Sequence, residues 1–328
     1  MNSRSNRLIK VLLISLHVLS ASSVPFIMSD AFIIQPSLLN TTTNVTIPPP
    51  SPADPRMTIR ASYRLDVLLD PKSVLAIVTN EMAKLAIMDY NGRLGSFQST
   101  PWAGYSDTKI QFKVAAAAQR VETRIAVWSL YYLAANMGIL NRYCHVQFRI
   151  LWDNVQVATL RISPARSSQA TIERRGGQQQ QNNIEDLPFL PDPSASFGVS
   201  NNGVNGTSLT YGELIVGCLY NEDAVDLSVT EVLGAVMAGL RNVAPMSKTD
   251  RMDGIFKTSV EGIDSEVCFA GNDVTPDEPR YQYQFVISTL RTMPQWLLGE
   301  GRLAEIHCGL IIYGRYVGIS LLNKLRPD

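Results

Sequence analysis

Histidines and carboxylates are the residues of this sequence that could perform acid–base or metal chemistry. Two of the three histidines stand next to a cysteine, in the pairs Cys144-His145 and His307-Cys308. Successive residues of a strand point to opposite faces of a sheet, so neither pair forms a single metal site simply. We therefore interpret both histidines as ordinary strand residues and expect no metal site and no cofactor.

Short motifs that mark common catalytic sites, such as H-E-x-x-H, G-x-S-x-G and G-x-x-x-x-G-K-[ST], do not occur in the sequence. Paired carboxylates can still act without a local motif, as they do in glycosidases. The candidates are Asp66, Asp70, Glu81 and Glu122, although their plainer roles are solvent-facing charge or, for Asp70 especially, a helix cap. A protein without catalytic activity is favoured, and an extracellular hydrolase with a carboxylate site between two modules is the alternative.

A pattern that occurs twice describes the elements that would position such residues. The segments "HVQFRILWDNVQVA" at 145–158 and "EIHCGLIIYGRYVG" at 305–318 are offset by 160 residues. Apolar residues alternate with period two in both segments, which is typical of a strand. Asp153-Asn154 and Tyr313-Gly314 then fit two-residue hairpin turns, and the first copy indicates a bulge near Ala158.

Helical patterns repeat in the same way. The segments 127–140 and 287–300 share the offset of 160 residues, whereas the helices that follow Asp70 and Ser228 are offset by 158. Each copy reads as strand, helix, strand, strand, helix, strand, strand. This order predicts an α+β fold of two tandem ferredoxin-like (split βαβ) modules, each βαββαβ with an extra C-terminal hairpin strand, packed as a pseudo-symmetric pair.

Composition divides the chain into five segments. Residues 1–31 have the layout of a secretory signal peptide, with basic residues before an apolar run that is shorter than the roughly 20 residues of a membrane span. Residues 32–58 read as a disordered, glycosylated arm, and residues 164–208 as a low-complexity linker rich in Gln and Pro. The modules occupy 59–163 and 209–328. We expect an extracellular (secreted) protein with no integral membrane insertion.

Three Asn-x-Ser/Thr acceptors agree with export, at Asn40, Asn44 and Asn205. The dibasic pair Arg174-Arg175 lies in the expected linker and is a candidate processing site. Cleavage there would release two chains of one module each.

The overall composition and net charge limit the kinds of partner that the protein can bind. The 328 residues are 45% hydrophobic and 18% charged, and the formal net charge is zero, so no surplus of cations exists to neutralise a nucleic acid. The partner is unknown, with an extracellular protein or a glycan as candidates. Tyr313, Arg315 and Tyr316 form a candidate contact patch at the second hairpin.

Other aromatic and sulfur residues have plainer interpretations. Trp128, Tyr131 and Tyr132 lie on one helix at spacings that favour core packing. The four cysteines allow three pairings; a bond between Cys218 and Cys268 is one option.

The stretch "IAVWSLYYLAANMGILNRYCHVQFRILWDNVQVATL" resembles uncharacterised secreted proteins of filamentous ascomycete fungi, in which a W-x-L-Y helix precedes F-x-L-x-W-x-x-x-x-V. The likeness covers residues 120–162 and, more loosely, 280–322, where Ser288 replaces the tryptophan. A looser likeness to two-subunit ferredoxin-like fungal killer toxins rests on Arg174-Arg175 and implies a toxin-like precursor, but the sparse cysteines depart from that pattern. These resemblances imply a fungal origin and transfer no catalytic residue. The signal, the sequons, the duplication and the missing motifs together predict a secreted, glycosylated, non-enzymatic interaction protein.

Overall fold

The computed structural model describes residues 43–47, 54–99, 102, 104–116, 118, 121–140, 142–165, 208–211, 214–252, 254–260, 262–271 and 281–325. They all belong to one compact unit, Asn40–Asp328. The expected signal peptide, Asn40, Asn205 and Arg174-Arg175 lie outside the described residues.

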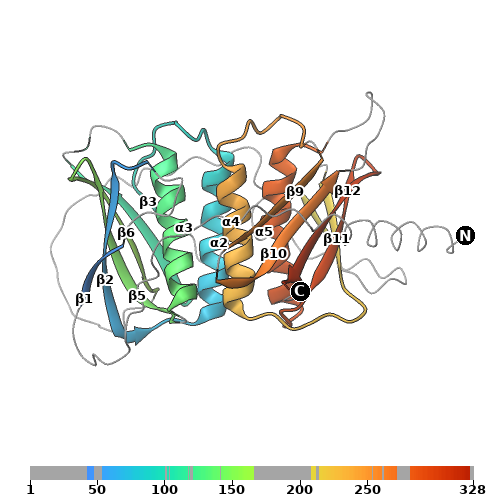
Figure 1. Cartoon of the computed structure of the whole chain (residues 1–328), viewed down its shortest axis with the longest axis horizontal. Helices are drawn as coiled ribbons and strands as arrows, with labels where there is room; N and C mark the ends of the chain where they lie inside the picture. Colours follow the sequence, from blue (N-terminus) through green and yellow to red (C-terminus); the bar gives the residue numbers. More distant parts are fainter. Residues whose placement is uncertain are drawn as a thin grey trace, which may run out of the picture. The chain divides into compact units, whose positions relative to one another are not determined.

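Two sets of elements follow one another in the same order (Figure 1). The first set is β1 (Thr43–Ile47), β2 (Met57–Leu68), α2 (Pro71–Ile87), β3 (Phe97–Gln98), β4 (Thr108–Val114), α3 (Thr123–Ile139), β5 (Cys144–Trp152) and β6 (Val155–Pro164). The second set is β7 (Ser208–Tyr211), β8 (Leu214–Tyr220), α4 (Val229–Val243), β9 (Ile255–Val260), β10 (Ile263–Gly271), α5 (Tyr283–Gly299), β11 (Ile306–Ile312) and β12 (Arg315–Lys324). The tandem α+β duplication is therefore confirmed.

Each set forms a six-stranded antiparallel sheet, in the orders β1-β2-β5-β6-β4-β3 and β7-β8-β11-β12-β10-β9. The two orders match strand for strand. They differ from the ferredoxin-like arrangement that we expected, because a split βαβ unit places one strand between the two strands that flank its helix. Here the hairpin of β5 and β6 lies in the middle of the sheet, so three strands separate β2 from β3. The sequence predicts a disordered arm over residues 32–58. Within this range, Thr43–Ile47 instead form strand β1, which pairs with β2.

Both central hairpins have the turns that the sequence predicts. Asp153 and Asn154 have φ of 51° and 65°, and Tyr313 and Gly314 have φ of 50° and 75°. A bulge follows in each copy, so Ile150 pairs with Ala158 and Leu310 with Gly318. The bulge near Ala158 is confirmed, and the second hairpin has an equivalent one.

Local sequence explains where the helices begin. The carboxylate of Asp70 accepts hydrogen bonds from the backbone N and the Oγ of Ser73, each at 2.8 Å, and Pro71 occupies the first turn of α2. Ser228 and Glu231 form the expected capping box at the start of α4.

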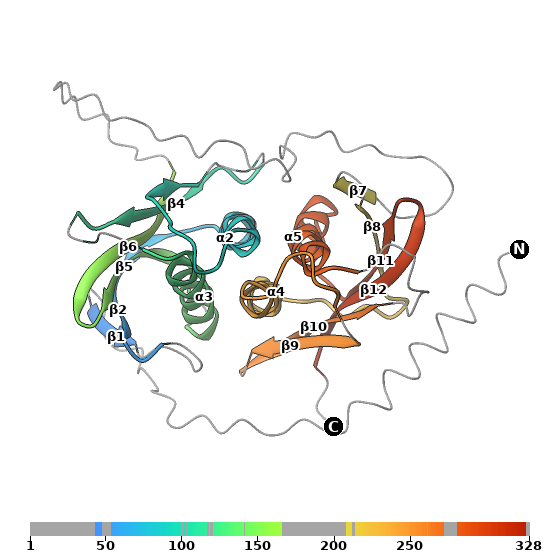
Figure 2. The same ribbon diagram turned by 90° about the horizontal axis from the view of Figure 1, so that it is seen from above.

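Among the described residues, helices α2, α3, α4 and α5 lie between the two sheets (Figure 2). Helix α2 packs against α4 and α5, and α3 packs against α4. Since α4 is the counterpart of α2 and α5 that of α3, the α2–α5 and α3–α4 contacts are reciprocal, as in an isologous dimer. The expected pseudo-symmetric pairing therefore describes these contacts.

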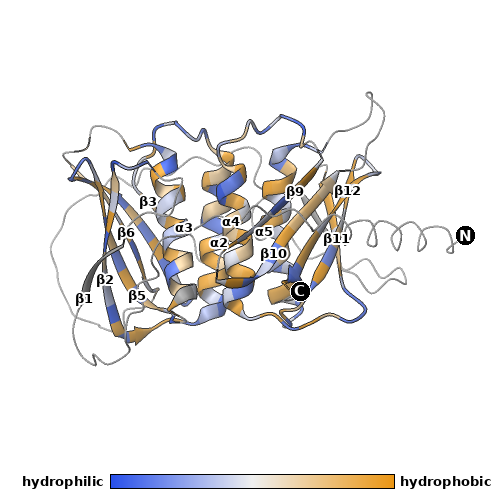
Figure 3. Ribbon diagram, viewed as in Figure 1, coloured by the Kyte–Doolittle hydropathy of each residue, from blue (hydrophilic) through white to orange (hydrophobic). Residues whose placement is uncertain are grey.

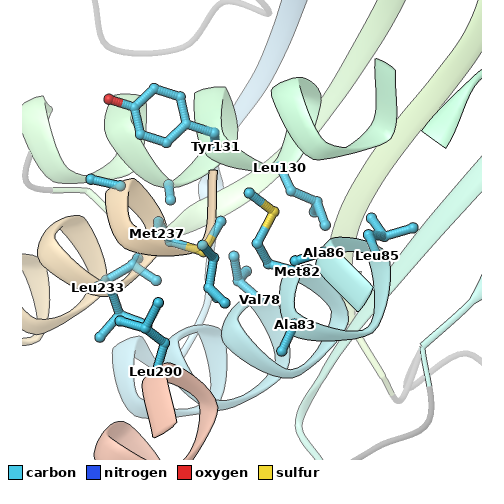
Figure 4. Close-up of a cluster of buried hydrophobic side chains, with 14 of the residues drawn as sticks. Val78, Met82, Ala83, Leu85, Ala86, Leu130, Tyr131, Leu233, Met237 and Leu290 are labelled. Carbon is cyan, nitrogen blue, oxygen red and sulfur yellow. The ribbon is translucent and has the colours of Figure 1, made fainter. Parts of the chain in front are cut away.

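Apolar side chains from all four helices meet at this junction (Figure 4). Met82, Leu130, Met237 and Leu290 are each no more than 1% exposed, and they belong to one buried cluster that includes residues of both modules. Figure 3 shows that hydrophobic residues are frequent along these helices. Burial of each such side chain contributes about 1.5–3 kcal/mol, so the junction is a core rather than a surface contact.

Cys218 and Cys308 form a disulfide between neighbouring strands β8 and β11, with Cα atoms 4.0 Å apart. The bond lies within the second half of the chain, as in the pairing of Cys218 with Cys268 considered from the sequence. The partner of Cys218 is, however, Cys308 and not Cys268. At the same place in the first sheet, Ala61 lies opposite Phe148. Among the described residues, no helix is both long enough and apolar enough to cross a bilayer.

Candidate functional site

A pocket of about 460 Å³ opens where the first module meets the end of α4. Its walls come from the loop before β2, the start of α3, the end of β5 and the last turn of α4. The lining residues are Asp54, Pro55, Met57, Tyr90, Arg124, Ile125, Trp128, Trp152, Arg241, Asn242 and Pro245.

Register and helical spacing bring these side chains together. Met57, the first residue of β2, lies directly opposite Trp152, the last residue of β5. Arg124 and Trp128 are one helical turn apart at the start of α3, so they share a face. Arg241 is the basic residue in the last turn of α4.

Asp54 is the carboxylate of the pocket, and arginines surround it. Its Oδ1 accepts from the backbone N and the Nε of Arg56, both at 3.0 Å, and its Oδ2 accepts from Nη2 of Arg56 at 2.7 Å. Nη1 of Arg124 is 3.9 Å from the same Oδ2. The hydrogen bonds from Arg56 lower the pKa of Asp54 to about 2. Asp54 is therefore ionised throughout the physiological range.

Guanidinium groups cover the aromatic rings of the pocket. The Cζ atoms of Arg56 and Arg124 are 4.4 and 5.1 Å from the ring centroid of Trp152. Arg241 lies 5.5 Å from the ring of Trp128 in the same way. Such cation–π contacts contribute about 0.5–1 kcal/mol at exposed sites and orient the planar groups.

Trp128 and Arg241 are each oriented by further contacts. Nε1 of Trp128 donates to the hydroxyl of Tyr90 at 3.0 Å. Nε and Nη2 of Arg241 donate to Oδ1 of Asn242 at 3.0 and 2.7 Å, and its Cζ is 4.3 Å from the ring of Tyr131. Within the described part of the chain, no carboxylate lies within 4.0 Å of Arg241. Arg241 is thus a cation with a fixed orientation, and no acidic side chain of the described residues neutralises its charge.

The carboxylates proposed for a hydrolase do not converge. Asp70 caps α2, Asp66 pairs with Arg64 on a sheet face, and Glu81 pairs with Lys84 within α2. Glu122 precedes α3 and pairs with Arg124. The pocket therefore has the position of the expected inter-module site but not its paired carboxylates of raised pKa.

The two strand histidines have ordinary polar partners. Nε of Arg161 donates to Nε2 of His145 at 3.1 Å, and Nδ1 of His307 is 3.0 Å from Oδ1 of Asn221. Burial lowers the pKa of both imidazoles. In the described ranges, no group of three or more His, Cys, Asp or Glu side chains has the geometry of a metal site.

The remaining sequence candidates fall elsewhere. Tyr313 and Tyr316 are 65% and 48% exposed at the β11–β12 hairpin, on either side of Arg315, and the ring of Tyr316 reaches over Gly309. Tyr131 and Tyr132 are buried as expected, but Trp128, 8% exposed, also lines the pocket. Asn44 lies in β1, where it pairs with Ser62.

Arg241, Arg124 and Asp54 are pocket residues that sequence reasoning missed. They lie on α4, on α3 and in a loop, so no local motif contains them. The clue in the sequence was the single basic residue in the last turn of α4.

These features define a duplicated α+β protein with a cationic, aromatic junction pocket. No family model matches the chain, and no curated protein does. One solved structure, the tandem DUF26 ectodomain of the Arabidopsis thaliana cysteine-rich receptor-like protein PDLP8, is 8% identical, with 81% of this chain and 97% of that chain covered. Its TM-score of 0.22 is too low to support an argument about fold or function.

Proposed function

We propose that this chain is a secreted, glycosylated protein without catalytic activity, and that the junction pocket binds a small ligand with an anionic group beside a flat apolar surface. The observation that carries the proposal is Arg241, which is positioned against Trp128 and is not neutralised by any acidic side chain among the described residues. The signal-like N-terminus and the sequons support the extracellular assignment. The resemblance to secreted fungal proteins supports a fungal origin.

Asp54 distinguishes a binding site from a hydrolytic one. A general acid needs a pKa near the working pH, whereas the arginines lower the pKa of Asp54 to about 2. Asp54 therefore orients Arg56 and Arg124 and supplies no proton. The pocket chemistry supports recognition of an anion rather than bond cleavage.

Titration with benzoate, followed by the tryptophan fluorescence of the full chain, tests the pocket. Benzoate should quench the emission saturably, and Arg241→Gln should weaken this binding about tenfold, because a charge-assisted hydrogen bond contributes about 1.5–3 kcal/mol. Benzyl alcohol, which lacks the charge, and Lys72→Gln, which removes an exposed cation elsewhere, are the controls. Equal affinity of wild type and Arg241→Gln for benzoate would overturn the assignment.

Expression in a filamentous fungus tests the extracellular assignment. The protein should appear in the medium, and glycosidase treatment should increase its electrophoretic mobility. Asn40→Gln, Asn44→Gln and Asn205→Gln together should abolish that shift. An intracellular, unglycosylated product would refute secretion without affecting the pocket.

A further inference from the structure

The outer face of the first sheet is strongly basic. Inward positions of its strands, such as Ile59, Ile110, Phe148 and Leu160, are buried against the helices. The alternate positions point away from the helices, and six of them carry cations. These are Arg60, Arg64, Lys109, Lys113, Arg149 and Arg161, here called the basic face.

Acidic residues hardly offset this charge. Asp66 pairs with Arg64 at 3.2 Å, and both side chains are more than half exposed. In the part of the chain that the structure describes, the other five cations make no salt bridge. Exposed ion pairs contribute about 0–1 kcal/mol, so even Arg64 remains available to a partner.

Strand register fixes how the cations are spaced. Arg60 lies directly opposite Arg149, and Thr159 and then Lys113 continue the same row across β6 and β4. With about 4.8 Å between strands, this row spans roughly 15 Å. Arg161 lies in the next row, about 7 Å along the strands. The result is a two-dimensional array of charges across the outer face of the sheet.

Arg161 is held in place within this array. Its Nε donates to Nε2 of His145 at 3.1 Å, so that nitrogen of the imidazole is an acceptor. Burial, Arg161 and Arg64 all lower the pKa of His145, which favours the neutral ring. The guanidinium of Arg161 is therefore oriented by a neutral partner and keeps its full charge.

The second sheet shows that the fold does not need these cations. The positions that correspond to Arg60 and Arg149 are Gly217 and Gly309, which lie opposite each other in the same way. Leu321 replaces Arg161, Ala270 replaces Lys113, and Glu266 replaces Lys109. Two sheets of identical strand order thus have outer faces of different character, one basic and one largely apolar.

We propose that the basic face binds an acidic polysaccharide, a linear glycan that carries carboxylate or sulfate groups. Rows of exposed cations on a sheet face match repeated anionic groups by charge complementarity. The outward positions of β2, β4, β5 and β6 hold no Phe, Tyr or Trp side chain, whereas single-stranded nucleic acids are bound mainly by base stacking on such rings. The choice of an extracellular polyanion rests on the secretion proposed above.

The test compares two charge-matched double variants of the full chain. Arg60→Gln/Arg149→Gln removes two cations from the basic face, and Lys72→Gln/Arg93→Gln removes two exposed cations elsewhere. Binding of polygalacturonate and of heparin is measured by calorimetry over a range of salt concentrations. The two glycans distinguish carboxylate from sulfate as the preferred group.

We expect the basic-face variant to lose about tenfold or more in affinity for at least one glycan, and its salt dependence to be less steep by roughly two released counterions. The control variant should bind within about twofold of wild type. Equal losses in both variants would show attraction by overall charge and overturn the proposal. Tighter, basic-face-dependent binding of single-stranded DNA or of phosphatidylserine vesicles would overturn it in favour of those partners.

Folding controls and cross-tests of the two sites separate this proposal from the pocket and secretion proposals. Unchanged circular dichroism and thermal midpoints no lower than that of the wild type show that the variants are folded. Arg241→Gln should leave glycan binding unchanged, and the basic-face variant should leave benzoate binding unchanged. Loss of glycan binding by Arg241→Gln would refute a separate site, whereas failure of secretion would refute only the extracellular assignment.

Discussion

Arg60 and Arg149 lie directly opposite each other on neighbouring strands β2 and β5, and both side chains are exposed. Like charges that face each other across two strands destabilise a sheet. The second module has Gly217 and Gly309 at these positions, so the repulsion is not inherent in the fold. A charge pair that is retained at a cost in stability is expected where binding requires it.

Removing this repulsion should stabilise the protein. We expect Arg149→Gln to raise the free energy of unfolding by roughly 0.2–1 kcal/mol, measured by urea denaturation at low ionic strength. High salt should abolish the gain, because it screens charges between exposed side chains. A loss of stability at low salt would mean that Arg149 makes a favourable contact in the native sheet.

The duplication could be predicted from the sequence because both copies preserve their local patterns. The hairpin turn at Asp153-Asn154 and the caps at Asp70 and Ser228 depend on a few adjacent residues. The strand order could not be predicted in this way. Pairing of Ile59 with Ile150 joins segments far apart in the chain, and period-two alternation does not reveal which strand lies beside which.

The basic face was missed in the sequence analysis for a different reason. A formal net charge of zero argued against a nucleic acid as the partner, but this total does not reveal the basic outer face of the first sheet, because acidic residues elsewhere in the chain offset it. The alternation of Arg60 and Arg64 with Ile59, Ala61 and Tyr63 was a usable signal. The pocket offered less, because Asp54, Trp128 and Arg241 meet only through tertiary packing.

Cleavage between the modules should leave them associated. Met82 and Met237 belong to the shared buried cluster, so separating the modules would expose it. We expect a chain with a specific protease site in place of Arg174-Arg175 to elute after cleavage as one particle in size-exclusion chromatography. Met237→Asp, which places a charge in the junction, should let the halves separate. Separation of the unmodified halves would instead support the toxin-like precursor.

Gly318 is expected to be intolerant of a side chain. A Cβ at this position would lie 2.6 Å from the carbonyl oxygen of Ala270, whereas a Cβ at Gly217 would meet nothing within 4 Å. Gly318→Ala should therefore lower the free energy of unfolding by about 1–3 kcal/mol, and Gly217→Ala should not. Thermal unfolding of both variants measures the difference. Equal midpoints would show that β10 moves away at little cost.

Protonation of Asp54 should destabilise the pocket loop. Folding lowers the pKa of this carboxyl from 3.8 to about 2, so its stabilising effect is fully present above pH 3.8 and is lost as the pH falls through 2. The stability difference between wild type and Asp54→Asn should thus be constant near neutral pH and shrink in acid. Urea denaturation at several pH values measures it, with high salt as the control. A difference that grows in acid would contradict the ion pairs with Arg56 and Arg124.

Thiol reactivity should distinguish the four cysteines. Cys144 and Cys268 are buried, and burial raises the pKa of both thiols, that of Cys268 to about 11. Only a thiolate attacks a thiol reagent, so the reagent should react slowly with the native protein. After unfolding without reductant, it should titrate two thiols. Reduction of the bond between Cys218 and Cys308 should raise the count to four and cost about 2–4 kcal/mol of stability. Four thiols in the unreduced protein would show that β8 and β11 are joined by hydrogen bonds alone, as β2 and β5 are at Ala61 and Phe148.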